Sequence, residues 1–467
     1  MPSKGVQCYS YIAVPGCKIE FSVPGQTITK DQLSTFASDH LEVDKKEIHG
    51  LTNFKGTFSF KVLKDGNQIT SQDVEINVLD GKVESGSLQA MENQRSVIAN
   101  DVIVSFGFYD AGPGVAGLPN SEQVWVTVTP NYSGWMGQVA PPGSEQAAKP
   151  FTKFFLPAAH DIGMNSMDNS LAVLKSTALI DVLKNINPIV AKIVGPLSHS
   201  AAEALAPNIV RGLAITQKDA LSTVLSIGAR YFEFRPAYLY SEIRNLHPIP
   251  DELYFSHSAI PGMAYAQFLH DCVDFLVQNP TEIIVVQLRW DGVPAECARP
   301  SDEDLSNYLN TAIATSNGSV ASASEDDMRN LSIQDLRAQN KRLILFVNSD
   351  SFSTYTDAGN ATLDGTSLIA EFNAITPENQ QGKPFTNFQC QATATNIRDV
   401  VVYSVLAADA SSSCLLATKP ICDAKTLPWI RDNAGRLIDG QLVVAMNDFF
   451  DGATADVCIG WSRKRLE

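Results

Sequence analysis

Residues 153–163 read Lys-Phe-Phe-Leu-Pro-Ala-Ala-His-Asp-Ile-Gly, and the larger part of the chain can be interpreted around this stretch. It begins as a short apolar run and ends abruptly in a histidine, a carboxylate and a glycine. In an α/β enzyme this is the pattern of a strand that carries functional side chains at its C-terminal end, and a TIM barrel places its chemistry at that end of its strands. His160 and Asp161 are therefore candidate functional residues.

Four later segments repeat the pattern of an apolar strand followed by polar residues. They are residues 229–235 (ARYFEFR), 253–257 (LYFSH), 283–289 (IIVVQLR) and 442–448 (LVVAMND). Their polar positions supply a second histidine, two arginines and two carboxylates, namely His257, Arg235, Arg289, Glu233 and Asp448. Two histidines suit a reaction in which one removes a proton and the other donates one, and arginine binds phosphate through its planar fork. The set therefore indicates acid–base chemistry on a phosphate group.

From residue 151 onward, strand patterns alternate with helical patterns, which predicts a parallel sheet with crossover helices. Eight strands are expected to start near residues 153, 230, 253, 283, 342, 388, 399 and 441. Helices are expected over residues 262–278, 302–315, 332–339 and 427–433, and residues 355–385 are expected to form a long polar loop. Eight strands in this length predict a (β/α)8 barrel with insertions.

The largest insertion lies between the first two predicted strands. Apolar residues recur at helical spacing over residues 171–197, with lysines between them and a break at Pro188. This pattern fits a helical pair packed on the barrel, and it also fits a lid or interfacial helix that meets lipid. The sequence leaves both interpretations open.

Residues 1–137 have an all-β pattern of short runs rich in β-branched and aromatic residues. Asp65-Gly66 and Asp80-Gly81 lie between such runs, which is a hairpin signal, and residues 31–40 are expected to form one short helix. This number of short strands predicts a β-sandwich of unknown role. Residues 138–150, rich in Pro, Gly and Ala, predict a linker to a catalytic domain over residues 151–467.

The composition is that of a soluble globular protein with net charge −16, from 35 basic and 51 acidic residues. That charge opposes general affinity for nucleic acid. No apolar run reaches transmembrane length, and no signal peptide is visible after Met1. The sequence therefore favours a cytoplasmic or peripheral membrane location. Secretion stays open because there are four sequons, at Asn131, Asn317, Asn330 and Asn360.

Eight cysteines are too sparse for a disulfide scaffold, and their spacing does not suggest zinc. The even count permits up to four bridges. Cys8 with Cys17 and Cys414 with Cys422 are candidates because they are close in sequence. The sequence indicates no oligomeric state.

Four motifs, in order and spacing, resemble the catalytic barrel of the phosphatidylinositol-specific phospholipase C family. They are AAHDIG (158–163), GARYFEFR (228–235), YFSH (254–257) and FLVQNPTEIIVVQLR (275–289). The resemblance is to the bacterial-type, metal-independent branch and to fungal phospholipase-C-like phosphodiesterases. It covers residues 150–460 and is stronger in the first half than in the second.

The resemblance implies a TIM barrel that cleaves phosphatidylinositol or a related glycolipid at a membrane surface. A neighbouring hydroxyl attacks phosphorus and a cyclic phosphate forms. His160 corresponds to the general base and His257 to the general acid. Asp448 is expected to pair with His160 and Asp161 with His257. Three further residues are expected to contact the substrate: Arg235 at the phosphate, with Glu233 and Arg289 nearby.

The resemblance also bears on metal use. Calcium-dependent relatives have a second carboxylate where this chain has Arg235, because calcium needs several hard oxygen ligands. An arginine takes the place of the cation and repels it. We therefore expect no catalytic metal and no cofactor.

Two segments depart from the family pattern. Residues 388–395 (FQCQATAT) contain neither acid nor tyrosine for binding inositol, and residues 347–350 (VNSD) lack the arginine usual in the bacterial branch. The headgroup therefore stays open. Two alternatives follow: a phosphodiesterase for another headgroup, or a catalytically weak lipid- or glycan-binding protein that uses the β-sandwich.

Overall fold

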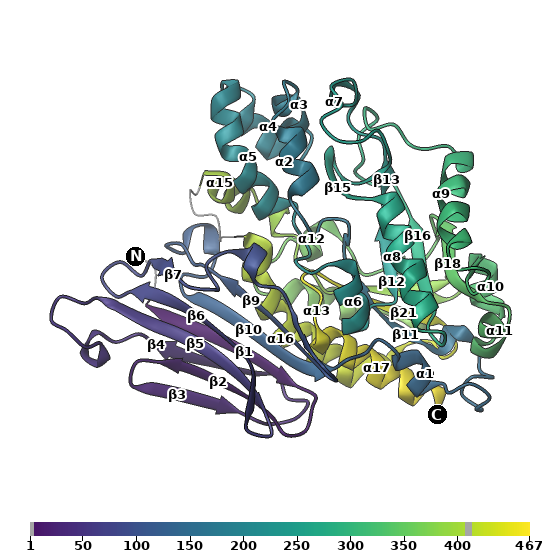
Figure 1. Ribbon diagram of the computed structural model, residues 1–467, viewed down its shortest axis with the longest axis horizontal. Helices are drawn as coiled ribbons and strands as arrows, with labels where there is room; N and C mark the ends of the chain where they lie inside the picture. Colours follow the sequence, from purple (N-terminus) through teal and green to yellow (C-terminus); the bar gives the residue numbers. More distant parts are fainter. Residues whose placement is uncertain (1–3, 407–412) are drawn as a thin grey trace.

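The N-terminal part of the chain forms two β-sheets that share one core (Figure 1). The structure, a computed structural model, describes residues 4–406 and 413–467. The first sheet has the order β4 (Ala37–Glu42), β1 (Gly5–Ile12), β10 (Glu122–Pro130), β9 (Val102–Tyr109) and β8 (Val97–Ala99). The second has the order β3 (Gln26–Lys30), β2 (Cys17–Val23), β5 (Lys55–Lys64), β6 (Asn67–Asn77) and β7 (Val83–Ser85).

Alternation of apolar and polar residues explains how these sheets pack. In β5, the side chains of Phe58 and Phe60 are buried, whereas those of Lys55 and Lys61 are exposed. The ring of Phe60 meets that of Phe106 from the other sheet, with centroids 5.2 Å apart. A face-to-face pair of sheets with one inner core is the packing of a β-sandwich. The prediction of a sheet-rich N-terminal part is confirmed.

The predicted turns are present, but the predicted short helix is wrong. Asp65 and Gly66 both have positive φ and join β5 to β6, and Gly81 also has positive φ between β6 and β7. Residues 37–42 form strand β4, antiparallel to β1, instead of the end of a helix. Pairing with β1 overrides the local pattern, as tertiary context often does for short segments.

The C-terminal part contains an eight-stranded sheet in which every paired neighbour is parallel. Its order is β17 (Ala321–Ala323), β18 (Lys341–Val347), β16 (Ile284–Leu288), β12 (Tyr231–Phe234), β11 (Phe155–Ala159), β21 (Leu442–Asn447), β20 (Phe385–Gln389) and β19 (Phe352–Ser353). Among the described residues β17 and β19 do not pair with each other. The sheet is a half-barrel with helices around it, consistent with a barrel.

Two predicted barrel strands are not in this sheet. Residues 254–257 form β14 (Tyr254–His257), but it belongs to a three-stranded antiparallel sheet with β13 (Pro236–Ala237) and β15 (Ile260–Ala264). β12 pairs directly with β16, so no position is left between them for β14. The segment near residue 399 is helix α15 (Arg398–Leu406), because β20 already has a partner on each side.

Helices fill the connections between the strands (Figure 1). The predicted helices are present as α8 (Tyr265–Gln278), α9 (Asp302–Ala314), α11 (Ile333–Ala338) and the end of α16 (Cys414–Asn433). The predicted long loop over residues 355–385 contains α12 (Asp357–Asn360), α13 (Thr366–Asn373) and α14 (Pro377–Gln380), so that prediction is wrong. Outside the insertion after β11, the other α-helices of the described residues are α1 (Trp135–Val139), α6 (Leu221–Ile227), α7 (Ser241–Arg244), α10 (Glu325–Asn330) and α17 (Gly452–Leu466).

The insertion after β11 is helical, as predicted, but it has four helices rather than two. They are α2 (Asp168–Leu174), α3 (Leu179–Lys184), α4 (Pro188–Val194) and α5 (His199–Leu213). Pro188 begins α4, and the side chain of Asn187 caps it by accepting from the Ile189 N–H. Proline suits the first helical position because its missing N–H would have no partner there. Whether these helices meet lipid stays a prediction.

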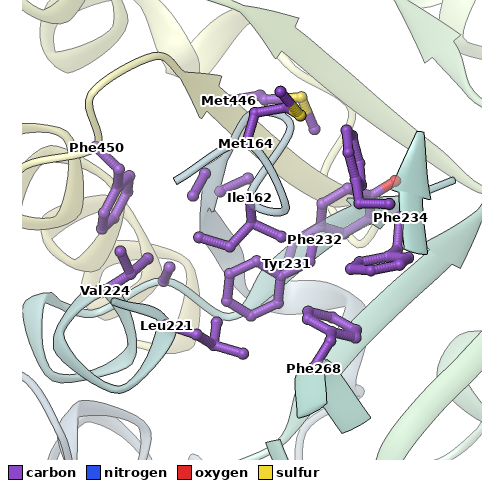
Figure 2. Close-up of a cluster of buried hydrophobic side chains, with 14 of the residues drawn as sticks. Ile162, Met164, Leu221, Val224, Tyr231, Phe232, Phe234, Phe268, Met446 and Phe450 are labelled. Carbon is purple, nitrogen blue, oxygen red and sulfur yellow. The ribbon is translucent and has the colours of Figure 1, made fainter. Parts of the chain in front are cut away.

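One hydrophobic core joins the first β-sheet to the barrel. It includes Tyr109 and Trp125 of that sheet together with side chains from the barrel strands. Figure 2 shows a part of this core in which the side chains of Ile162, Met164, Phe234 and Met446 lie in one cluster. Ile162 follows Asp161 directly and Phe234 precedes Arg235, so this packing holds the backbone of the predicted site residues. Residues 139, 140 and 147 of the predicted linker are also buried. The domain bounds stay a prediction.

All eight cysteines are buried free thiols, so neither candidate bridge is present. Cys8 and Cys17 lie on strands of different sheets. Cys414 and Cys422 both lie in α16, where eight residues rise about 12 Å, beyond the reach of a disulfide. In the described part of the chain no helix is long and apolar enough to cross a membrane.

Candidate active site

Strand register places His160 beside Asp448. β11 and β21 are parallel neighbours in which Ala159 lies opposite Asn447, so the next residues of both strands meet. The His160 N–H donates to the Asn447 carbonyl at 3.0 Å, and His160 Nδ1 lies 2.7 Å from Asp448 Oδ1. The family resemblance implied this pairing, and the catalytic roles of the two residues stay a prediction.

Asp161 is the centre of the site. Its side chain is 1% exposed, and its carboxylate lies 3.6 Å from His160 Nε2, 3.1 Å from Arg235 Nη2 and 3.8 Å from His257 Nε2. Its φ is 43°, a left-handed conformation that aspartate tolerates better than most residues. One buried carboxylate therefore contacts both predicted histidines and the predicted phosphate-binding arginine.

Arg235 and His257 reach the site from the small antiparallel sheet and the end of β12. The Ser256 N–H donates to the Arg235 carbonyl at 3.0 Å, and the guanidinium lies 5.8 Å from the centroid of the Phe255 ring. Arg235 Nε and His257 Nδ1 are buried and have no hydrogen-bond partner among the described residues. Buried polar groups are normally hydrogen-bonded, so these are two atoms with which a ligand could form hydrogen bonds.

Glu233 and Arg289 pair with each other next to this set. Arg289 Nη1 lies 2.7 Å from Glu233 Oε1, and Arg289 Nε lies 2.6 Å from Asp291 Oδ2. Glu233 is 3% exposed at its side chain, whereas Arg289 is 30% exposed. These carboxylates raise the pKa of Arg289 although burial opposes them. The arginine therefore stays charged at the edge of the site.

The two histidines have opposite protonation states. Burial alone would lower the pKa of His160, but the carboxylates of Asp161 and Asp448 outweigh it and raise that pKa to about 9. Burial lowers the pKa of His257 to about 4, because the positive Arg235 and His160 offset the attraction of Asp161. Near neutral pH, His160 is protonated and His257 is neutral.

The pKa values of the two buried carboxylates, Asp161 and Asp448, also shift in opposite directions. Burial would raise the pKa of Asp161, but the charges of Arg235, His160 and His257 hold it below its ordinary value. Burial raises the pKa of Asp448, and His160 opposes the shift. The lowered pKa keeps Asp161 ionised, so it can hold both rings and the guanidinium in place.

Three residues that contact the site residues were not predicted from the sequence. Asp291 pairs with Arg289, and Thr216 and Gln217 hydrogen-bond the backbone at His160. Asp291 stands two residues after Arg289, at the polar end of a strand, which is a signal that could have found it. Thr216 and Gln217 follow a helical insertion rather than a strand, so the strand-end pattern could not reach them.

Across residues 4–406 and 413–467, no three His, Cys, Asp or Glu side chains are grouped so as to hold a metal ion. Metal independence rests on Arg235 and stays a prediction.

The comparisons with known proteins give structural likenesses only. No protein-family model matches the chain, and no curated protein sequence matches it. A solved phosphatidylinositol-specific phospholipase C from Listeria monocytogenes is similar at 14% identity, with 71% of this chain and 98% of that chain covered and a TM-score of 0.39. A variant of the phosphatidylinositol-specific phospholipase C from Staphylococcus aureus is similar at 12% identity, with 70% and 96% covered and a TM-score of 0.40. Likeness at this level defines neither substrate nor mechanism.

Proposed function

We propose that the protein is a phosphodiesterase in which a neighbouring hydroxyl of the substrate attacks phosphorus and a cyclic phosphate forms. One observation carries the proposal: two imidazoles and one guanidinium lie 3.1–3.8 Å from the single buried carboxylate of Asp161. Two imidazoles can remove and donate the protons of such a reaction. The guanidinium can stabilise the charge that develops on the phosphate in the transition state.

The guanidinium of Arg235 supports the proposal that the site binds an anionic ligand. Within the described part of the chain the buried Arg235 Nε donates to no acceptor, and a phosphate oxygen would accept its hydrogen bond. Arg235 already shares its charge with Asp161, so it is held in place before the ligand arrives. A phosphate at Arg235 would lie beside both histidines.

The predicted roles assign one proton transfer to each histidine. Asp448 accepts from His160 Nδ1, which leaves Nε2 of that ring to take the proton of the attacking hydroxyl. His257 then protonates the leaving oxygen, which is that of diacylglycerol if the substrate is phosphatidylinositol or a related glycolipid at a membrane surface. Glu233 and Arg289 are proposed to contact the headgroup. These roles require His257 to gain a proton and His160 to lose one when substrate binds.

The test is phosphorus NMR of the purified protein with phosphatidylinositol vesicles. A resonance of a cyclic inositol phosphate would support both the reaction type and the substrate class. Absence of turnover on these vesicles, followed by turnover of another phosphodiester from a panel, would keep the reaction and change the headgroup. Absence of turnover on every phosphodiester would contradict the proposal.

Excess chelator is expected to leave the activity unchanged. The physical reason is that the guanidinium of Arg235 supplies a fixed positive charge next to the reacting phosphate, a role that calcium would otherwise fill. The measurement compares initial rates with and without chelator, and a calcium-dependent phospholipase treated in the same way serves as the control. Activity that disappears with chelator and returns with calcium would contradict the expectation.

Phosphate binding is expected to raise the pKa of His257 from its low value of about 4. A nearby anion favours the charged imidazolium, so the sign of the change is upward. Proton NMR titration of the ring, with and without inorganic phosphate, measures it, and exposed His270 serves as the control ring. If the His257 pKa stayed near 4 with saturating phosphate, His257 would not be the general acid.

A further inference from the structure

The side chain of Gln217 links the two strand ends that carry the His160–Asp448 pair. Gln217 is 1% exposed. Its Nε2 donates to the His160 carbonyl at 2.8 Å and to the Asn447 carbonyl at 3.1 Å. Its Oε1 accepts from the Phe450 N–H at 2.9 Å. One side chain therefore holds the backbone at His160 and on both sides of Asp448.

Thr216 supports the same backbone from the preceding position. Its Oγ1 donates to the carbonyls of His160 and Asp161 at 3.2 and 3.0 Å, and its own carbonyl accepts from the Phe449 N–H at 2.7 Å. Asp161 and Phe449 both have positive φ, 43° and 42°. Such conformations persist only where the surroundings hold them. Thr216 contacts both strained positions, and Gln217 contacts the residues next to them.

The next two residues anchor this segment to the N-terminal sheets. Asp219 accepts from the N–H and the hydroxyl of Ser96 at 2.8 and 2.7 Å. Lys218 donates to Asp219 at 2.9 Å, and its ammonium lies 5.5 Å from the centroid of the Trp125 ring. All these side chains except Ser96 are buried. Residues 216–219 are therefore fixed at the catalytic pair on one side and at the sandwich on the other.

We propose that Gln217 is a positioning residue that keeps His160 and Asp448 at hydrogen-bonding distance. The inference rests on the proposed function for the role of the pair, and it deepens that function by adding a residue that does not touch substrate. Besides the contacts of residues 216 and 217, the His160 N–H bond to the Asn447 carbonyl and the ring bond to Asp448 join the two strand ends. Small displacements matter there, since a shift of about 1 Å can cost about 10²-fold in rate.

The test compares Gln217→Met with Gln94→Met. Gln94 is a matched control, because it is fully buried in the sandwich and makes the same three kinds of bond. Its Nε2 donates to the carbonyls of Leu88 and Phe108 at 2.9 and 3.2 Å, and its Oε1 accepts from the Phe108 N–H at 2.7 Å. Both variants lose one buried amide with three hydrogen bonds, but only Gln217→Met touches the catalytic pair.

The first readout is the ring pKa of His160 by NMR, which needs no substrate. The charged groups that face this ring are Asp161, Asp448 and Arg235, and the titratable ring of His257 also interacts with it. A looser contact with Asp448 should lower the His160 pKa by about one pH unit or more in Gln217→Met, and Gln94→Met should leave it unchanged. An unchanged value in folded Gln217→Met, or an equal change in both variants, would overturn the proposal.

The second readout is kinetic. With an active substrate, Gln217→Met is expected to lower kcat by about 10–100-fold with little change in KM, whereas Gln94→Met should lower neither. If Gln217→Met does not fold, Thr216→Val takes its place in both measurements under the same criteria, because it removes only two bonds to the catalytic backbone. The ring pKa decides the positioning role even if no phosphodiester is turned over, so the two proposals can fail separately.

Discussion

Replacing His160 with alanine is expected to lower turnover of the phosphodiester by about 10²–10⁴-fold, the usual contribution of a positioned general base. In the proposed roles this imidazole takes the proton of the attacking hydroxyl through Nε2, while the Asp448 carboxylate accepts a hydrogen bond from Nδ1. Replacing His257 should cause a loss of similar size on a lipid substrate. Turnover is measured by phosphorus NMR, and folding is checked by circular dichroism.

A substrate with a nitrophenol leaving group separates the two roles. Such a leaving group departs without protonation, so loss of the general acid matters less. We expect this substrate to restore much of the rate to His257→Ala and little to His160→Ala. Rescue of His160→Ala instead would mean that the roles are exchanged, which the protonation states of the free protein would suit, with His160 charged and His257 neutral. His270→Ala, an exposed histidine on α8, is the control and should retain full turnover.

The sequence predicted the parts of the site that depend on strand ends. Polar residues after an apolar run mark the C-terminal end of a strand, and parallel strands present these ends at one edge. For this reason His160, Asp161, Arg235 and Asp448 could be grouped before the structure was known. The parallel register of β11 and β21 then brings His160 to Asp448, because the residues before them, Ala159 and Asn447, lie opposite each other.

The failed predictions depend on neighbours that a local pattern does not contain. The run Val400-Val401-Val402 favours a strand locally, yet the segment is helical in α15 because both edges of β20 are occupied. β14 has a strand pattern and is a strand, but its partners are β13 and β15. His257 nevertheless lies 3.8 Å from the Asp161 carboxylate, although the predicted topology was wrong at that strand.

Replacing Glu282 with alanine is expected to lower the free energy of unfolding by about 3–5 kcal/mol, because it leaves the charge of Arg230 buried without a partner. Both side chains of this pair are fully buried, with Arg230 Nη2 2.7 Å from Glu282 Oε2. Glu282 also accepts from the N–H groups of Met136 and Gly137, in the segment that leads from the first sheet to the barrel. Urea denaturation measures the change through the midpoint and the slope.

Asp439→Ala is the matched control, since Asp439 pairs with Lys153 at 79% side-chain exposure and an exposed pair contributes about 0–1 kcal/mol. Replacing Arg230 and Glu282 together with apolar residues is also informative. Such a replacement is often neutral for a buried ion pair, but Arg230 also donates to the carbonyls of Tyr132 and Ser133. The Ser133 carbonyl and the two N–H groups would lose their hydrogen bonds to this pair, whereas the Tyr132 carbonyl would keep the Trp135 N–H. Each lost bond at a buried group costs about 1–3 kcal/mol. We therefore expect the double variant to remain destabilised, and a double variant as stable as the natural protein would show that the pair does not hold this segment on the barrel.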